Sequence, residues 1–252
     1  MEFKRVPALD KCFNILSLMA SSKKPLALSE IASALNFNKS TVYNIIYTLV
    51  DLGILEIGEG KFSFGPRLYV MGKAAEKSSE LIRTIHPYLE EVRDRTNLTV
   101  FLGMMSDTNV IILDKAESTR SLKISSEIGV RIPLLAGAHG KALLSQKSDE
   151  EIHQIISQKG LKQYTRYSCT DKEKYLALIK NVRKERISIE KEEYIDGIRA
   201  LAVPLPINKL HLNMAIWAVG LKGQIPNNAL REYSATLKDV VHKIEDRFSL
   251  QT

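Results

Sequence analysis

The sequence of 252 residues predicts an α+β fold with a mainly helical first part and a larger second part that contains an antiparallel sheet. Three observations predict it. Apolar residues recur at helical spacing through residues 9–52. In the second part, strand-like runs are joined as hairpins, and the helical segments are grouped between them. This order favours α+β over a doubly wound parallel sheet.

The composition excludes several classes of protein. Apolar residues make up 44% of the chain and charged residues 26%, which is typical of globular domains. The apolar runs are far shorter than the roughly 20 residues of a membrane helix, and no signal peptide is visible, so we expect a cytoplasmic protein. The two cysteines cannot form a disulfide framework or a four-ligand zinc site. The net charge of +7 permits an anionic partner, but no segment is a polybasic arm.

The first part begins with three expected helices, at residues 9–21, Ser29–Leu35 and Lys39–Leu52. Pro25 follows the first helix and prevents its continuation. Glu30 suits the third position of a capping box at the start of the second helix, although Ala27 stands at the cap itself. Asn38 is a good N-cap for the third helix, and Gly53 suits the position just after its end.

A hairpin and a fourth helix complete the first part. The strands are expected at Ile54–Ile57 and Lys61–Phe64, joined by a tight turn at 58–60. Pro66 then suits the start of a helix that runs to Ser78. Helix, short helix, turn, longer helix and hairpin is the order of a winged helix-turn-helix. We therefore divide the chain into a winged helix-turn-helix at 1–65, a linker helix at 66–79 and a second domain at 80–252.

The third helix carries an apolar stripe and a polar face. Val42, Ile45, Ile46 and Leu49 form the stripe, so the opposite face is free to enter a DNA major groove by its N-terminal end. Hydroxyl groups can contact phosphates, and an Asn side chain can pair with adenine. The candidate DNA-contacting residues are Asn38, Lys39, Ser40, Thr41, Tyr43, Asn44, Tyr47 and, on the hairpin, Lys61. Further phosphate candidates are Lys4, Arg5, Lys23, Lys24 and Arg67. Two alternatives stay open: an ordinary surface helix, and a winged helix that binds protein.

The second part alternates helical and strand patterns. Helices are expected at residues 79–96, Gly140–Ser145, Glu150–Gln158, Lys172–Glu185 and Asn227–Phe248. Strands are expected at Leu98–Met105, Val110–Lys115, Ser121–Ser126, Ile187–Glu192, Ile198–Pro204 and Leu212–Leu221. Helices over one face of such a sheet leave a cavity where a loop crosses it. The backbone N–H groups of Gly137–Gly140 could hold a carboxylate there, although the glycines also suit a plain loop-to-helix turn.

Seven ordered motifs resemble the IclR-type transcriptional regulators. They are VPALDK at 6–11, LSEIA at 28–32, NKSTVY at 38–43, TLVDLG at 48–53, FSFGPRL at 62–68, PLLAGAHGKALL at 133–144 and EEYIDGIRALAVP at 192–204. The resemblance covers nearly the whole chain. It implies a winged helix-turn-helix, a linker helix and a GAF/PAS-like effector-binding domain, assembled as a dimer or tetramer on palindromic double-stranded operators. Family members commonly have Arg where this chain has Asn44, so its base preference need not follow theirs.

The resemblance also implies a pocket for small organic acids. The positions that match it are Ala138, His139, Glu190, Ala200, Trp217 and Val219. Trp217 and Val219 stand where the family has serine hydroxyls, and Ala200 offers no polar atom, so a carboxylate would lose hydrogen bonds worth ~1.5–3 kcal/mol each. Two interpretations stay open: a larger or more apolar effector such as an aromatic acid, or a filled pocket without an effector. His139 contacts the ligand or is structural.

Catalytic signatures are weak. The five histidines are scattered, and no metalloprotease, Walker, nucleophile-elbow or dinucleotide motif occurs, so we expect neither an enzyme nor a cofactor. A nucleophile and base formed by Cys169 and His139 is a remote alternative, because nothing in the sequence orients them. Glu192 and Glu193 are expected on a solvated strand end, with Glu190 alone near the pocket. We expect a DNA-binding regulator, with repression favoured by the resemblance.

Overall fold

The computed structural model describes residues 6–22, 24–78, 80–207 and 212–249. Contacts within the chain divide it into two units between Glu80 and Leu81, and the helix at Pro66–Ser78 is counted with the first. The expected boundaries at 65 and 79 stay a prediction. Within the described ranges, no helix is long and apolar enough to cross a membrane.

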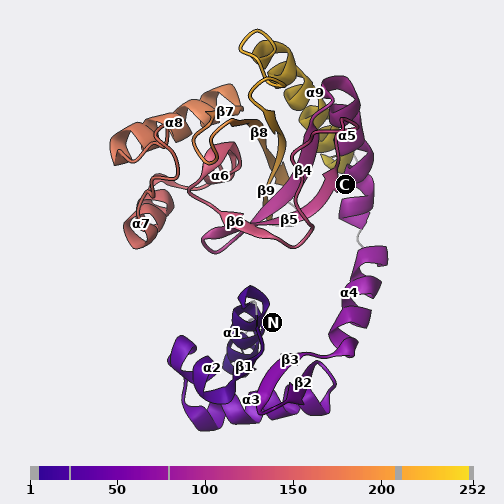
Figure 1. Ribbon diagram of the computed structural model, residues 1–252, viewed down its shortest axis with the longest axis vertical. Helices are drawn as coiled ribbons and strands as arrows, with labels where there is room; N and C mark the ends of the chain where they lie inside the picture. Colours follow the sequence, from indigo (N-terminus) through magenta and orange to yellow (C-terminus); the bar gives the residue numbers. More distant parts are fainter. Residues whose placement is uncertain (1–5, 23, 79, 208–211, 250–252) are drawn as a thin grey trace. The chain divides into compact units, whose positions relative to one another are not determined.

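The first unit contains helices and a small antiparallel sheet (Figure 1). Its elements are α1 (Pro7–Ser21), β1 (Leu26–Ala27), α2 (Leu28–Leu35), α3 (Lys39–Asp51), β2 (Leu55–Gly58), β3 (Lys61–Phe64) and α4 (Pro66–Ser78). The sheet has the order β1-β3-β2, so β1 pairs with the outer side of the hairpin. The sequence gives no periodic signal for β1 because it is only two residues long.

The first unit folds around the apolar stripe predicted on α3. Val42, Ile46 and Leu49 are buried together with Ile15 of α1 and Phe62 of β3. This burial excludes water from one side of α3 and fixes which side stays exposed.

Local hydrogen bonds set the ends of these helices. The backbone N–H of Ala27 donates to Glu30 Oε2 at 2.7 Å, so half of a capping box forms although the cap has no side-chain oxygen. Gly53 has φ +69°, the left-handed conformation expected just after a helix. Arg67 donates from Nη1 to the carbonyl oxygen of Leu52 at 2.9 Å and satisfies the last turn of α3.

The second unit is built on a six-stranded sheet in the order β6-β5-β4-β9-β8-β7, with each neighbouring pair antiparallel. The strands are β4 (Thr99–Ser106), β5 (Asn109–Ala116), β6 (Arg131–Pro133), β7 (Ser188–Lys191), β8 (Ile198–Ile207) and β9 (Leu212–Leu221). The helices are α5 (Glu80–Thr96), α6 (Gly137–Leu144), α7 (Asp149–Lys159), α8 (Lys172–Glu185) and α9 (Leu230–Ser249).

Helices cover both faces of this sheet. Figure 1 shows α5 and α9 on one side and α6, α7 and α8 on the other. Side chains alternate between the faces along β8 and β9. Leu201, Val203 and Ile216 pack under α5 and α9, on what we call the closed face. Ala200 and Trp217 pack toward α6, on what we call the pocket face.

The strand expected at Ser121–Ser126 does not form. The free edge of β5 is taken by the segment that follows it, where Asn109 pairs with Pro133 and Ile111 pairs with Arg131. Backbone bonds extend this pairing, because Ile112 N donates to Val130 O at 3.1 Å and Gly129 N donates to Ile112 O at 2.8 Å. With that edge occupied, residues 121–126 run as an extended loop.

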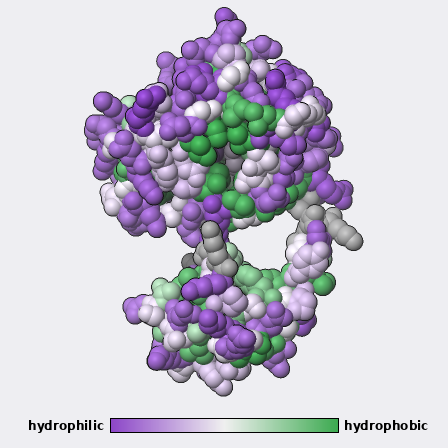
Figure 2. Space-filling view, in the orientation of Figure 1, coloured by the Kyte–Doolittle hydropathy of each residue, from purple (hydrophilic) through white to green (hydrophobic). Residues whose placement is uncertain are grey.

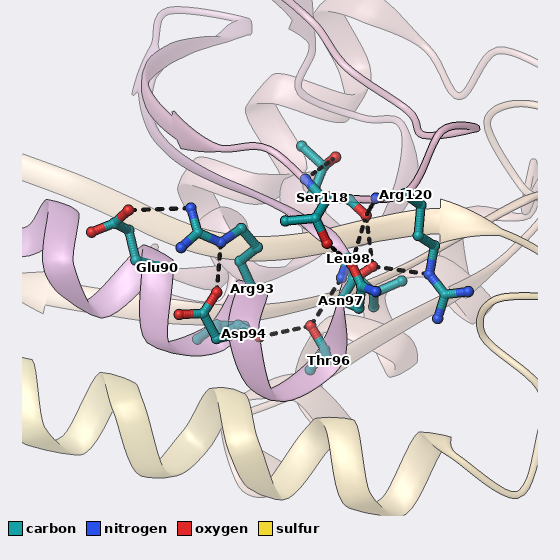
Figure 3. A network of polar contacts seen from close by, with 11 residues as sticks. Glu90, Arg93, Asp94, Thr96, Asn97, Leu98, Ser118 and Arg120 are labelled. Carbon is teal, nitrogen blue, oxygen red and sulfur yellow. Dashed lines mark hydrogen bonds and ion pairs between the residues drawn. The ribbon is translucent and has the colours of Figure 1, made fainter.

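The junction between α5 and β4 is held by a polar network (Figure 3). Asn97 leaves the helix with φ +52°, a left-handed conformation that Asn tolerates. Its carbonyl oxygen accepts from Ser118 Oγ at 2.8 Å and from Arg120 Nε at 3.3 Å. Thr96 Oγ1 donates back to Val92 O at 2.7 Å and closes the last turn. These bonds fix the chain as it enters the centre of the sheet.

Candidate functional site

The N-terminal half of α3 presents a continuous polar surface. Lys39, Ser40 and Asn44 are exposed, and Thr41 is half-buried. Asn38 caps the helix: its Oδ1 accepts from the backbone N–H and from the hydroxyl of Ser40, both at 3.2 Å. The side-chain NH2 group of Asn38 therefore supplies the donors with which this side chain can make a further hydrogen bond. The bond from the Ser40 N–H satisfies one of the backbone donors that the first turn of a helix leaves without an intrahelical partner.

Two tyrosines connect this surface to the hairpin. Tyr43 and Tyr47 contact each other with ring centroids 4.3 Å apart, and Tyr47 lies edge-on to Phe62 at 5.9 Å. Both tyrosines are 40% exposed or more, so their hydroxyl ends stay accessible. Lys61 precedes Phe62 on β3 and is exposed. Because side chains alternate along a strand, Lys61 and the buried Phe62 leave β3 on opposite faces.

The residues expected to contact phosphates differ in what the structure describes of them. Arg67 is exposed and donates from Nη1 to the carbonyl oxygen of Leu52, and it stays a prediction because the guanidinium has further N–H donors. Lys24 is exposed and stays a prediction. Lys4, Arg5 and Lys23 lie outside the described residues.

The second unit contains a cavity of about 230 Å³ on the pocket face. Its lining consists of Phe101, Ile112, Ile124, Ser125, Ser126, Ile132, His139, Glu190, Tyr194, Ile195, Ile198, Ala200, Trp217 and Val219. The pocket positions proposed from the sequence thus come together around one cavity, except Ala138, which is fully buried and does not line it. Figure 2 shows apolar side chains gathered on the viewed face of this unit, surrounded by hydrophilic ones.

Strand register explains why these residues meet. Glu190 of β7 lies opposite Ala200 of β8, which in turn lies opposite Val219 of β9. Phe101 of β4 lies opposite Trp217 of β9, and their rings stack with centroids 5.5 Å apart. The cavity floor is therefore made by two rows of directly paired residues, which the hydrogen-bonded sheet holds in place.

Glu190 is a buried carboxyl group, only 4% exposed. Its Oε1 accepts from the backbone N–H of Tyr194 at 3.0 Å, and the backbone N–H of Ala138 also stabilises its charged form. Burial outweighs these bonds and raises the pKa of Glu190.

His139 is also buried, between aromatic rings. Its ring lies 5.4 Å from that of Trp217, and Nε2 is 3.2 Å from the carbonyl oxygen of Pro133. Burial is the main cause that lowers the pKa of His139 to about 4, so the ring is neutral at pH 7. A neutral ring that bonds a carbonyl through Nε2 carries its proton there, which makes Nδ1 an acceptor.

The acidic run after Glu190 is not a solvated strand end, contrary to expectation. Glu192 is 8% exposed and accepts from Lys222 Nζ at 2.8 Å. Glu193 accepts from Lys141 Nζ at 2.6 Å, and Lys141 itself is 2% exposed. Glu192 is buried and Glu193 is half-buried, which is possible because each has a cationic partner close by.

Several lining residues were missed from the sequence. Ile124, Ser125 and Ser126 belong to the segment expected as a strand, and Tyr194 and Ile195 belong to a turn. Such segments have no hydrophobic period that would point them to a cavity. Phe101 could have been found, because side chains alternate along the predicted strand. Phe101 therefore lies on the same face as Gly103, and Val100 lies on the other face.

The Cys169 and His139 alternative finds no support in the geometry. The Cys169 thiol donates to the carbonyl oxygen of Asp171 at 3.6 Å, and burial raises its pKa. A thiol whose pKa is raised is a poor nucleophile, because the thiolate is the reactive form.

Comparisons with known proteins agree over both units. Residues 73–246 match the family "Bacterial transcriptional regulator IclR C-terminal", and residues 8–57 match the "IclR helix-turn-helix domain". The chain is 28% identical to the HTH-type transcriptional regulator KdgR of Escherichia coli, over 95% of this chain and 91% of that protein. It is 27% identical to the transcriptional repressor IclR of E. coli, over 92% of this chain and 86% of that protein.

Solved structures share the fold. An IclR transcriptional regulator from Alicyclobacillus acidocaldarius superposes with a TM-score of 0.76 at 24% identity, covering 96% of this chain and 98% of that one. An IclR homolog from Microbacterium hydrocarbonoxydans, crystallised with 4-hydroxybenzoate, gives 0.70 at 22% identity, covering 96% and 99%. The chain therefore belongs to the IclR family of bacterial transcriptional regulators, with an N-terminal helix-turn-helix for DNA and a C-terminal ligand-binding domain.

Proposed function

We propose that α3 enters the major groove of an operator by its N-terminal end. The observation that carries this proposal is the exposed polar start of the helix, with Lys39, Ser40 and Asn44 outward and the apolar stripe buried behind them. Residues at this end of a recognition helix contact base edges, and hydroxyl groups and the hairpin lysine contact phosphates. Two copies of the chain would read a palindromic operator in the cytoplasm, as a homodimer or homotetramer. A repressive role is supported by the names of relatives such as the E. coli repressor IclR.

The cavity of the second unit would hold a small effector that controls operator binding. Its volume of about 230 Å³ exceeds the roughly 150 Å³ of an engineered apolar cavity that binds benzene, so a substituted ring fits. The 4-hydroxybenzoate bound by the Microbacterium homolog supports a ring-sized ligand, such as the aromatic acid expected above. Control requires that the effector bind one geometry of the oligomer better than another, because equal affinity would shift nothing.

The DNA proposal is tested on fragments recovered from the source genome by the purified full chain. Affinity for a recovered operator and for a scrambled duplex is measured by fluorescence anisotropy at several salt concentrations. Asn44→Ala and Ser40→Ala should each reduce the discrimination between the two duplexes, by ~1–3 kcal/mol where the side chain reads a base. Lys61→Ala should weaken both duplexes about equally and lower the salt slope by about one.

Lys180→Ala, at an exposed position on α8 of the second unit, supplies the control. If all three α3 and hairpin variants bind like the control, the assignment of α3 to the groove is wrong. If the native protein binds no duplex even at low salt, a protein-binding winged helix is the better reading of this surface.

A further inference from the structure

The exposed face of α3 carries few charges. Its exposed residues are Lys39, Ser40, Tyr43, Asn44, Tyr47, Thr48 and Asp51. One cation stands at the start of this face and one carboxylate at its end, so the middle of the face is uncharged. Arginine and lysine are the side chains that most often pair with guanine in the major groove. A helix whose middle turns expose neither is poorly suited to read G·C pairs.

Two hydroxyl groups on this face are used within the protein. Ser40 Oγ donates to Asn38 Oδ1 at 3.2 Å, and Thr48 Oγ1 donates to the carbonyl oxygen of Asn44 at 2.7 Å. A hydroxyl group has a single proton to donate, so each side chain would lose its internal bond by donating to a base. The uncharged groups that remain in the middle of the face belong to Asn44 and the two tyrosines.

Asn44 lies one turn from both hydroxyl residues, on the same side of the helix. Its backbone carbonyl accepts from Thr48, but within the described ranges its side-chain amide makes no hydrogen bond. An amide offers a donor and an acceptor side by side, and this pair matches N7 and the N6 amino group of adenine. Because both groups of Asn44 are exposed and free, it can make this contact without giving up a bond in the protein.

The tyrosines beside Asn44 form a fixed apolar surface. Tyr47 follows Asn44 by three residues, so the two side chains are neighbours on the helix. The Tyr47 ring contacts that of Tyr43 with centroids 4.3 Å apart, and it lies edge-on to Phe62 at 5.9 Å. Phe62 is 2% exposed, so the buried end of β3 holds the Tyr47 ring in place. Apolar side chains in the major groove contact the C5 methyl group of thymine.

We propose that Asn44 pairs with an adenine and that the Tyr43 and Tyr47 rings contact the methyl group of a neighbouring thymine. Each half of the operator then contains adjacent A·T pairs under the middle of α3. The inference rests on the proposed function and refines it, because it names the bases that this helix selects. Both contacts use groups that distinguish A·T from G·C pairs in the major groove.

The test begins with a random pool of duplexes, from which the full-length protein selects its half-site. Modified bases then remove one group at a time from one half-site. 7-Deazaadenine lacks the N7 acceptor of adenine, and deoxyuridine lacks the methyl group of thymine. We expect one adenine at which 7-deazaadenine weakens binding about tenfold. At an adjacent thymine, deoxyuridine should weaken binding about fourfold, the value for one buried methyl group.

Asn44→Ala assigns the adenine contact. In this variant, 7-deazaadenine at the same position should weaken binding by about twofold or less, because the partner of N7 is gone. Asn181→Ala, at an exposed position on α8, is the matched control and should keep the tenfold effect. Asn44→Arg should prefer G·C to A·T at this position, because Arg pairs with N7 and O6 of guanine. A tenfold effect that persists in Asn44→Ala would overturn the adenine contact.

Tyr43→Ala and Tyr47→Ala, measured one at a time, assign the thymine contact. Each should reduce the effect of deoxyuridine, because each removes one ring of the pair. An effect that stays at the native value in both variants would overturn this contact. If Tyr47→Ala does not fold without its contact to Phe62, Tyr43→Ala decides alone, since the Tyr43 ring is 50% exposed.

The proposed function and this inference fail in different results. A pool from which no duplex is enriched would contradict DNA binding by α3 and both base contacts with it. An enriched half-site in which no adenine responds to 7-deazaadenine would overturn the base assignment and leave the groove assignment standing. A guanine that depends on Asn44 would have the same meaning.

Discussion

The two faces of the sheet in the second unit differ although the same strands build them. On the closed face, β8 and β9 supply Leu201, Val203 and Ile216, and helices α5 and α9 fill the space above them. On the pocket face, β8 supplies Ala200 and Ala202 in the alternate positions. The cavity exists because these side chains are short. Short side chains on one face of the sheet therefore leave a cavity, next to a central strand whose pairing with β5 shifts register between Leu102 and Gly103.

Trp217 is a large side chain on the pocket face, and a glycine on the neighbouring strand leaves space for its ring. A Cβ at Gly103 would lie 2.6 Å from Cη2 of Trp217, so only glycine at this position lets the indole ring lie flat over β4. Phe101 and His139 pack against the same ring at 5.5 Å and 5.4 Å. The pocket face thus combines small residues, which leave room, with one clamped aromatic group, which shapes that room.

The largest effect on the free energy of unfolding is expected when two buried isoleucines, one on each face, are each replaced by alanine. Ile216 on the closed face is 0% exposed, and Ile112, which lines the cavity, is 2% exposed. Ile216→Ala should lower the free energy of unfolding by about 4 kcal/mol, because it leaves a new cavity in a packed core. Ile112→Ala should cost about 2 kcal/mol, since it only enlarges a space that already exists. Urea unfolding followed by Trp217 fluorescence measures both, and equal losses would contradict the difference between the faces.

The next effect comes from the histidine buried on the pocket face. The pKa of His139 is lowered from 6.5 to about 4, so between these values the unfolded chain binds a proton that the folded chain does not. Stability from this group is therefore complete above pH 6.5, falls as the pH drops toward 4, and then levels off. The loss amounts to about 3 kcal/mol at 1.36 kcal/mol per pKa unit.

The measurement is the difference between the native protein and His139→Gln in unfolding free energy at pH 7.5 and pH 4.5. Taking the difference removes the carboxyl groups that titrate in the same range, including Glu190, whose raised pKa acts with the opposite sign. If the unfolding free energy of His139→Gln depends on pH as it does in the native protein, the His139 ring is not held neutral in the folded state.

Much of the fold could be predicted because local signals agreed with tertiary packing. Asn38 marks a helix start through its side-chain oxygen, and Gly53 and Pro66 mark helix ends through their backbone; the structure uses each one that way. The strand expected at residues 121–126 shows where such signals fail. Two segments competed for the edge of β5, and hydrogen bonds to Ile112 from residues 129–130 decided between them. A competition between distant segments leaves no trace in the period of either one.

Some features of the candidate site could likewise be predicted from the sequence, and others could not. The exposure of Lys39, Ser40 and Asn44 follows from helical spacing, which the sequence contains. The position of Glu190 against the Gly137–Gly140 loop does not, because it depends on how a strand and a helix start meet across the sheet. The sequence placed both groups near a pocket, but only the structure brings Glu190 Oε2 to 3.0 Å from the place that a Cβ on Gly137 would occupy.

The smallest effect on stability is expected when two alanines, one on each face, are each replaced by leucine. Ala218 lies on the closed face at 0% exposure, and Ala200 lines the cavity at 3% exposure. Ala218→Leu should destabilise the protein by about 2 kcal/mol, because the added atoms have no space among the helices. Ala200→Leu should cost less than about 1 kcal/mol, since its side chain extends into the cavity, and urea unfolding followed by Trp217 fluorescence measures both variants. A loss in Ala200→Leu as large as the loss in Ala218→Leu would mean that the cavity has no room for the added atoms.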